Sequence, residues 1–220
     1  MSVAIENFIK TIYKSDKHIS ENTKPGNIAK KLGISNAAAT DMAKKLATKD
    51  LLHYEKYQAL KLTEKGTKIA LNVIRKHRLW EAFLFETFDM SLHEIHREAE
   101  LLEHQTSCFL AEKISVYLGH PQFDPHGDPI PNEFGEITFN DTSIALANAI
   151  EGQQYRITRL MSDDKEFFDF CAINGLQHNN TLTVKKLFPK NKMIQISVDR
   201  SQTILLNIEF SKNIFVHEII

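Results

Sequence analysis

Histidine and glutamate side chains recur at helical spacing in the middle of the sequence. His77 and Glu81 are four residues apart, so on a helix they share one face. A second stripe, at i, i+4, i+7 and i+8, comprises His96, Glu100, Glu103 and His104. These three carboxylates and three imidazoles would repel one another on one surface, and divalent cations would offset that repulsion. Such donors without a thiolate suit Mn²⁺, Fe²⁺, Co²⁺ or Zn²⁺. The alternative is a solvated acidic helix face that holds no metal.

The net charge of −1 conceals two blocks of opposite charge. Residues 1–75 carry 14 Lys and Arg against 7 Asp and Glu, a balance of +7. Residues 76–141 carry 4 against 13, a balance of −9, and hold six of the ten histidines. Residues 142–220 carry 9 against 8. This asymmetry predicts an anionic partner for the first block and a cationic partner for the second.

The basic block has the pattern of a helix-turn-helix followed by a wing. Gly33 ends a short predicted helix, and Ser35 lies where it can cap a second helix over residues 37–49. The expected buried face of that second helix consists of Ala38, Met42 and Leu46. Roughly alternating polar and apolar residues over 51–63 predict a two-stranded hairpin, which in this position is a wing.

The second helix of this motif has the composition of a recognition helix. Such a helix needs small or polar side chains at its N-terminal end to reach base edges, with Lys or Arg around them to hold phosphates. The candidate DNA-contacting residues are Ser35, Asn36, Ala37, Thr40, Lys44, Lys45 and Lys56. The alternative is that the lysines only solubilise a small helical domain. The wing and the local charge of +7 favour DNA binding.

Two helical segments and a β-rich end complete the chain. Helices are expected from residue 63 to about 88 and from 91 to 118, and a proline-rich loop over 121–131. Five short strands and one helix over 164–173 predict a small barrel. The predicted strands span residues 153–161, 181–188, 193–198, 203–209 and 214–219. The fold is therefore expected to be mainly α with a small β domain.

Three stretches resemble the metal-dependent repressors of the diphtheria toxin repressor and manganese transport regulator family. They are residues 54–66 (YEKYQALKLTEKG), 75–81 (RKHRLWE) and 96–104 (HREAELLEH). The resemblance covers the whole chain and implies a transcriptional repressor rather than an enzyme. It also implies a homodimer that binds a palindromic double-stranded DNA operator when it is loaded with metal. The implied domains are a winged helix-turn-helix (1–73), a helical metal-binding and dimerisation domain (74–141) and a C-terminal SH3-like barrel (142–220).

The resemblance further implies two metal sites per subunit. One uses His77, Glu81 and His96, completed by the C-terminal barrel, where Asp164 is favoured over Asp163 and Glu166. The other, regulatory site consists of Glu100, Glu103, His104 and the first-helix residue Asn7. Where the iron-sensing branch has Cys, this chain has Glu100, so Mn²⁺ is the first expectation and Fe²⁺ the second.

The chain departs from the family pattern at three positions. Asn7 is uncharged where Asp or Met is usual, which should weaken the regulatory site. Lys10 replaces a carboxylate of the short manganese sensors, which argues against their closely spaced pair of metals. Asp124 stands where some long manganese sensors have Cys, and we hypothesise that it supplies the charge missing at Asn7. The alternative is that Asp124 only caps its own turn.

Two other classes of protein are compatible with parts of the sequence. A metal-dependent hydrolase would use the His and Glu set to activate water, but no HExxH, nucleophile elbow or phosphate loop is present. A winged-helix protein with a structural acidic face would take up no metal. The two distant cysteines, and the lack of a membrane-length apolar run or a signal peptide, predict a cytoplasmic protein with no membrane partner.

Overall fold

The computed structural model describes residues 1–17, 22–137, 142–162, 164–198 and 202–219. The chain divides into two compact units. The first consists of residues 1–77, 100–113 and 131–137, and the second of 78–99, 114–130 and the described part of 138–220.

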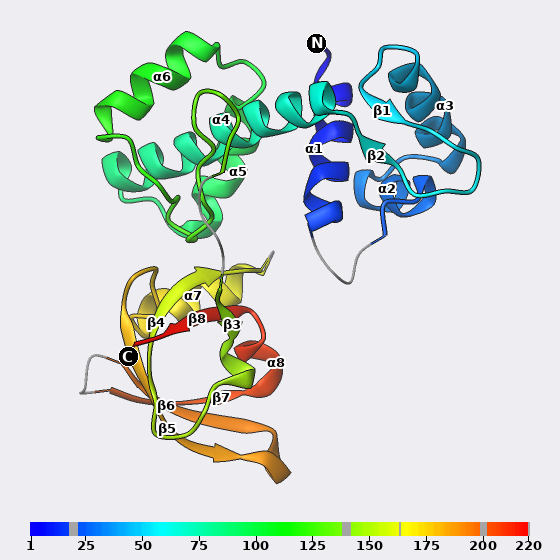
Figure 1. The fold of residues 1–220 in the computed structure, drawn as a ribbon. Coiled ribbons are helices and arrows are strands. Elements are labelled where there is room, and N and C mark those ends of the chain that lie inside the picture. Colours follow the sequence, from blue (N-terminus) through cyan, green and yellow to red (C-terminus); the bar gives the residue numbers. More distant parts are fainter. Residues whose placement is uncertain (18–21, 138–141, 163, 199–201, 220) are drawn as a thin grey trace. The chain divides into compact units, whose positions relative to one another are not determined.

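The N-terminal part folds as the predicted helix-turn-helix with a wing (Figure 1). Its elements are α1 (Val3–Lys17), α2 (Pro25–Leu32), α3 (Asn36–Ala47), β1 (Leu52–His53) and β2 (Lys61–Leu62). Pro25 begins α2, where its missing N–H costs nothing. Gly33 ends α2 at a φ of 64°, a left-handed conformation that favours glycine. Ser35 Oγ then caps α3 by accepting a hydrogen bond from the Ala38 amide.

Helices α1, α2 and α3 enclose one hydrophobic core with the hairpin. From α1 the core contains Phe8, Ile9 and Ile12, all fully buried. Of the three residues predicted to face inward from α3, Leu46 is buried and Met42 packs partly buried against the core, whereas Ala38 is exposed and the neighbouring Ala39 is buried instead. Two adjacent alanines contribute the same hydrophobicity, so only the packing partners decide which one faces inward.

The middle of the chain contains three helices: α4 (Glu64–Phe88), α5 (Leu92–Leu102) and α6 (Cys108–Tyr117). Gly66 in α4 is required by packing, since a Cβ there would lie 2.0 Å from the Leu51 carbonyl oxygen. A single helix over 91–118 was predicted, and this was wrong. The helix is interrupted because Ser107 Oγ accepts the Leu110 amide and starts α6, while Thr106 Oγ1 donates to the Leu102 carbonyl at the end of α5.

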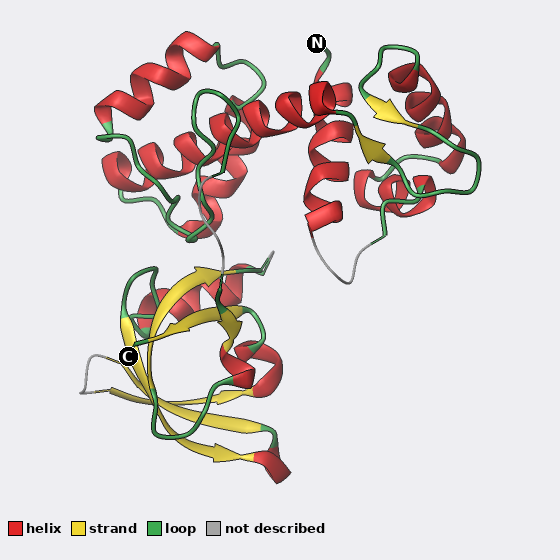
Figure 2. Cartoon of the chain, viewed as in Figure 1, coloured by secondary structure: helices red, strands yellow, loops and turns green. Residues whose placement is uncertain are grey.

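The C-terminal part is a six-stranded antiparallel sheet in the order β3-β8-β4-β5-β6-β7, drawn in yellow in Figure 2. Its strands are β3 (Ile144–Ala145), β4 (Gln154–Leu160), β5 (Thr181–Phe188), β6 (Met193–Val198), β7 (Gln202–Asn207) and β8 (Ile214–Glu218). The sheet curls around buried side chains such as Tyr155, Ile157 and Val216. The same part of the chain contains helices α7 (Lys165–Ile173), between β4 and β5, and α8 (Ile208–Ser211), between β7 and β8. The five predicted strands are confirmed with small shifts at their ends, whereas β3 and α8 were not predicted.

No helix in the described part of the chain combines the length and the apolar character that a membrane crossing requires.

The two cysteines differ in exposure. Burial raises the pKa of the Cys171 thiol to about 12, whereas Cys108 is exposed. Because the thiolate is the reactive form, we expect a thiol reagent to label Cys108 in the native protein at least about a hundredfold faster than Cys171. Mass spectrometry of timed samples measures both sites, with Cys108→Ser as the control. Similar labelling rates at both sites would contradict this assignment.

Candidate metal centre

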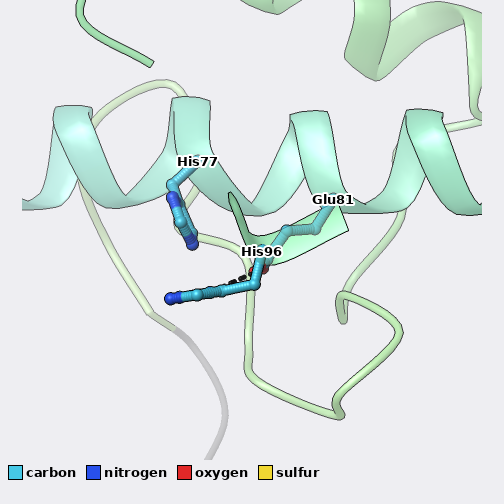
Figure 3. Close-up of side chains that lie close together, drawn as sticks. All are labelled: His77, Glu81 and His96. Atoms are coloured by element: carbon cyan, nitrogen blue, oxygen red, sulfur yellow. Dashed lines mark hydrogen bonds and ion pairs between the residues drawn. The ribbon is translucent and has the colours of Figure 1, made fainter. Parts of the chain in front are cut away.

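The first group of predicted ligands comes together between α4 and α5. His77, Glu81 and His96 each offer a ligand atom, and these atoms all lie within 4.8 Å of one another. Figure 3 shows the two α4 side chains, one helical turn apart, pointing toward His96 of α5. His96 Nδ1 lies 2.9 Å from Glu81 Oε1. Glu81 is almost fully buried while His96 is exposed, so this group is reachable from solvent through the His96 side.

A loop residue that the sequence analysis did not select joins this group. His126 Nε2 lies 3.5 Å from Glu81 Oε1. The loop is fixed to β4, since the Leu160 amide donates to the His126 carbonyl. A Cβ at Gly127 would lie 1.9 Å from the Thr158 carbonyl oxygen, so the loop can approach β4 this closely only with glycine. The available signal was the short turn 124–127, in which only Asp124 was considered.

Asp124 lies in the same loop, close to Glu81 and His126. Its Oδ1 accepts the backbone amides of His126 and Asp128, at 2.9 Å each, so it caps its own turn as the alternative interpretation expected. Its Oδ2 is 3.6 Å from Arg78 Nε. The hypothesis that Asp124 supplies the charge missing at Asn7 stays a prediction.

Burial and neighbouring charges shift the pKa values of Asp124 and His126 in this loop. Burial raises the pKa of Asp124 to about 8, and the neighbouring Glu81 and Asp128 carboxylates add to the rise. Burial lowers the pKa of His126, but the hydrogen bond and charge of Glu81, with Asp124 and Asp128, outweigh it and raise that pKa. Among the described residues, Asp124 Oδ2 is buried without a hydrogen-bond partner, and His126 Nε2 is buried at 3.5 Å from Glu81 Oε1. Buried oxygen and nitrogen ligand atoms gathered beside a buried carboxylate are suited to a divalent cation.

The second group of predicted ligands shares His77 with the first. His77, Glu100 and Glu103 offer ligand atoms that also lie within 4.8 Å of one another. His77 Nδ1 is 2.7 Å from Glu103 Oε2 and 3.5 Å from Glu100 Oε2. Glu103 is fully buried and, with His104, follows the last turn of α5 instead of continuing the predicted helical stripe. His77 thus contacts residues assigned to both of the predicted sites.

Helix α1 completes the second group from the other side. Asn7 Oδ1 is buried and, within the described residues, has no hydrogen-bond partner. His104 bridges two carboxylates, with Nδ1 2.7 Å from Glu6 Oε2 and Nε2 3.1 Å from Glu103 Oε1. Glu6 is not among the predicted ligands. Its signal was the i, i+4 spacing from Lys10, which places both on one face of α1.

Lys10 lies among the carboxylates of this group. Its Nζ is 2.7 Å from Glu100 Oε2, and 2.8 and 2.7 Å from the two oxygens of Glu103. Burial raises the pKa of Glu100, but the charge and hydrogen bond of Lys10, with His77 and Lys14, outweigh it and lower that pKa to about 2. Glu100 is therefore ionised at physiological pH.

Asp164 and its neighbours are placed differently. Asp164 is the N-cap of α7, where its side chain accepts the Glu166 amide. Neither group of clustered metal-ligand atoms in the described part of the chain includes it. Asp163 lies outside the described residues. The role of Asp164 as a ligand stays a prediction.

The candidate DNA-contacting residues lie on α3 and the wing. Ser35, Asn36, Ala37, Lys44 and Lys45 are exposed, and Thr40 is half-buried with its hydroxyl donating to the Asn36 carbonyl. On the wing, the Lys56 ammonium lies 4.9 Å from the centre of the Tyr57 ring. The Tyr57 side chain is 79% exposed. This surface therefore presents cations and small polar groups to solvent, as phosphate and base contacts require.

Known families match consecutive parts of the chain. Residues 1–60 match "Iron dependent repressor, N-terminal DNA binding domain" and residues 63–132 match "Iron dependent repressor, metal binding and dimerisation domain". Residues 144–218 match the FeoA domain. The diphtheria toxin repressor of Corynebacterium glutamicum is 30% identical over 184 residues, which cover 78% of this chain and 79% of that protein. The chain belongs to the iron-dependent repressor family.

Other members of this family are similar over part or all of the chain. The iron-dependent repressor IdeR of Mycobacterium tuberculosis is 32% identical over 128 residues, 57% of this chain but only 54% of that protein. The solved structure of a manganese-dependent transcriptional repressor in complex with manganese superimposes with a TM-score of 0.89 at 29% identity. That match covers 97% of this chain and 99% of the other. The predicted fold and the predicted class, a metal-dependent transcriptional repressor, are confirmed.

Proposed function

We propose that this repressor responds to Mn²⁺ and, when loaded, binds a palindromic DNA operator as a homodimer. The observation that carries this proposal is the donor set around Glu103, which consists of carboxylate, imidazole and amide groups without a thiolate. Hard oxygen donors with imidazole suit Mn²⁺, whereas a thiolate would favour softer metals. Fe²⁺ is the alternative metal, because such a donor set also accepts it.

The residues suggest how metal and DNA binding are coupled. A bound divalent cation supplies positive charge that neutralises the buried carboxylates. Asn7 and Glu6 belong to α1, while Glu103 and His104 follow α5. Helix α1 shares its hydrophobic core with α3. Holding α1 against Glu103 and His104 therefore also restricts where the recognition helix can move.

A dimer whose two DNA-binding domains are held in place can bind both halves of a palindromic operator. The two recognition helices must enter successive major grooves about 34–36 Å apart, and DNA-binding domains that move freely rarely match both half-sites. A preference of ~1–3 kcal/mol for the DNA-competent arrangement is enough for a switch. Exposed apolar side chains on α6, such as Phe109 (73%) and Tyr117 (68%), support a dimer because they would otherwise face water.

The proposal is tested by measuring DNA binding and metal content on the same samples. A palindromic duplex, selected from a random pool with the protein in MnCl₂, is titrated with protein in chelator, Mn²⁺, Zn²⁺ or, without oxygen, Fe²⁺. We expect Mn²⁺ to tighten binding about 5–150-fold over chelator. Equal binding in chelator and Mn²⁺ would refute the proposed response to Mn²⁺. Absence of metal uptake would favour the alternative interpretation, a winged-helix protein with a structural acidic face and no metal effector.

A further inference from the structure

A lysine ammonium already contacts the carboxylates that the regulatory metal would use. The Lys10 side chain is 5% exposed, and its Nζ makes three hydrogen bonds of 2.7–2.8 Å to Glu100 and Glu103. Lysine is rarely buried unless its charge is paired. Both oxygens of Glu103 accept from this one ammonium, so Lys10 engages the same atoms that a divalent cation would need.

The ammonium also balances charge. Without it, Glu100 and Glu103 would be two neighbouring carboxylates, one of them fully buried, beside the imidazoles of His77 and His104 and, for Glu100, the charge of Lys14. Burying carboxylates with so little compensating charge is costly. The contact joins α1 to the end of α5 across 90 and 93 residues of sequence, and all its members lie in one compact unit. Lys10 therefore holds α1 against the end of α5 in the metal-free chain.

We propose that Lys10 is a tethered cation that occupies the regulatory carboxylates in the metal-free protein and competes with the divalent metal for them. Because a ligand binds more weakly when its competent state is only partly populated, Lys10 raises the metal concentration at which the repressor loads. Asn7 and Glu6, on the same helix, remain to hold α1 once Lys10 is displaced. This inference rests on the proposed function for its metal competition, but not for its effect on the metal-free chain.

The test compares Lys10→Met with Lys17→Met, which removes an exposed lysine from the same helix. In EDTA we expect Lys10→Met to lower the melting temperature by about 5–15 °C, and Lys17→Met to leave it within about 2 °C. In calorimetric titrations with MnCl₂, Lys10→Met should bind at least about tenfold more tightly than wild type. Lys10→Arg keeps the charge and should resemble wild type in EDTA.

A double variant separates charge balance from lost packing. Lys10→Met/Glu100→Gln removes one of the facing carboxylates and should recover part of the melting temperature lost in EDTA. The inference is overturned if Lys10→Met matches Lys17→Met in both assays, or if it binds Mn²⁺ more weakly than wild type. If Lys10→Met is unfolded in EDTA, folding on addition of MnCl₂ supports the inference and continued unfolding overturns it.

The two proposals fail in different ways. If wild type and Lys10→Met both take up no Mn²⁺, the proposed function fails and the competition fails with it. The melting temperatures in EDTA still decide whether Lys10 balances the carboxylates. If wild type takes up Mn²⁺ and Lys10→Met binds it with the same affinity, the proposed function stands and the competition is refuted.

Discussion

Glu103→Gln is expected to abolish the response of DNA binding to Mn²⁺ and to lower the melting temperature in EDTA by about 5–10 °C. Glu103 is fully buried, and its two carboxylate oxygens contact Lys10 Nζ, His77 Nδ1 and His104 Nε2. An amide keeps the size of the side chain but removes the charge that balances Lys10 and attracts a divalent cation. Breaking a buried ion pair by removing one partner is strongly destabilising.

The measurements are thermal unfolding in EDTA and fluorescence anisotropy of labelled operator duplex with and without MnCl₂. Glu98→Gln is the matched control, since Glu98 is on α5 and forms a surface ion pair with Arg97. Exposed pairs contribute little, so its melting temperature should stay within about 2 °C of wild type and its Mn²⁺ response should persist. A full Mn²⁺ response in Glu103→Gln would place the regulatory metal elsewhere.

Lys44→Glu/Lys56→Glu is expected to weaken binding of the Mn²⁺-loaded protein to its operator by about 10²–10³-fold. Both side chains are exposed, one on α3 and one on the wing, so their replacement should leave the fold and metal uptake unchanged. A dimer carries each substitution twice, and up to four phosphate contacts are lost. The slope of log affinity against log salt should therefore become shallower by about 3–4.

The charge-matched control is Lys185→Glu/Lys190→Glu. Both lysines are exposed, on β5 and directly after it, and the change in net charge is the same. We expect nearly wild-type affinity from this control because only long-range charge is altered. Equal losses in the two double variants would mean that net charge, and not contact through α3 and the wing, determines DNA affinity.

Local features of the sequence determined the N-terminal elements. Gly33 and Ser35 mark the helix-turn-helix because their backbone and capping preferences act within a few residues. The spacing of His77 and Glu81 likewise fixed their common face, since both lie on one uninterrupted helix. The five short strands predicted a small C-terminal barrel, and the family resemblance added its SH3-like type.

Only the tertiary structure decided how the two ligand groups are built. Helix α5 ends at Leu102 and Glu103 lies in the turn that follows, because the side-chain caps at Thr106 and Ser107 compete with continuation of the helix. The tertiary structure brought His126 to Glu81 through a loop held against β4. Such contacts join residues far apart in sequence, and no local spacing encodes them.

Lys10 shows this division most clearly. Its helical spacing indicates a charged residue on an amphipathic helix, where solvent exposure is the ordinary outcome, and the family resemblance adds that it replaces a carboxylate of the short manganese sensors. In the folded chain it is buried against Glu100 and Glu103, about ninety residues away. The sequence determined which charges are present. The fold alone decided that an ammonium lies on carboxylates implied to bind a metal, because only packing of α1 against the end of α5 removes all these groups from water together.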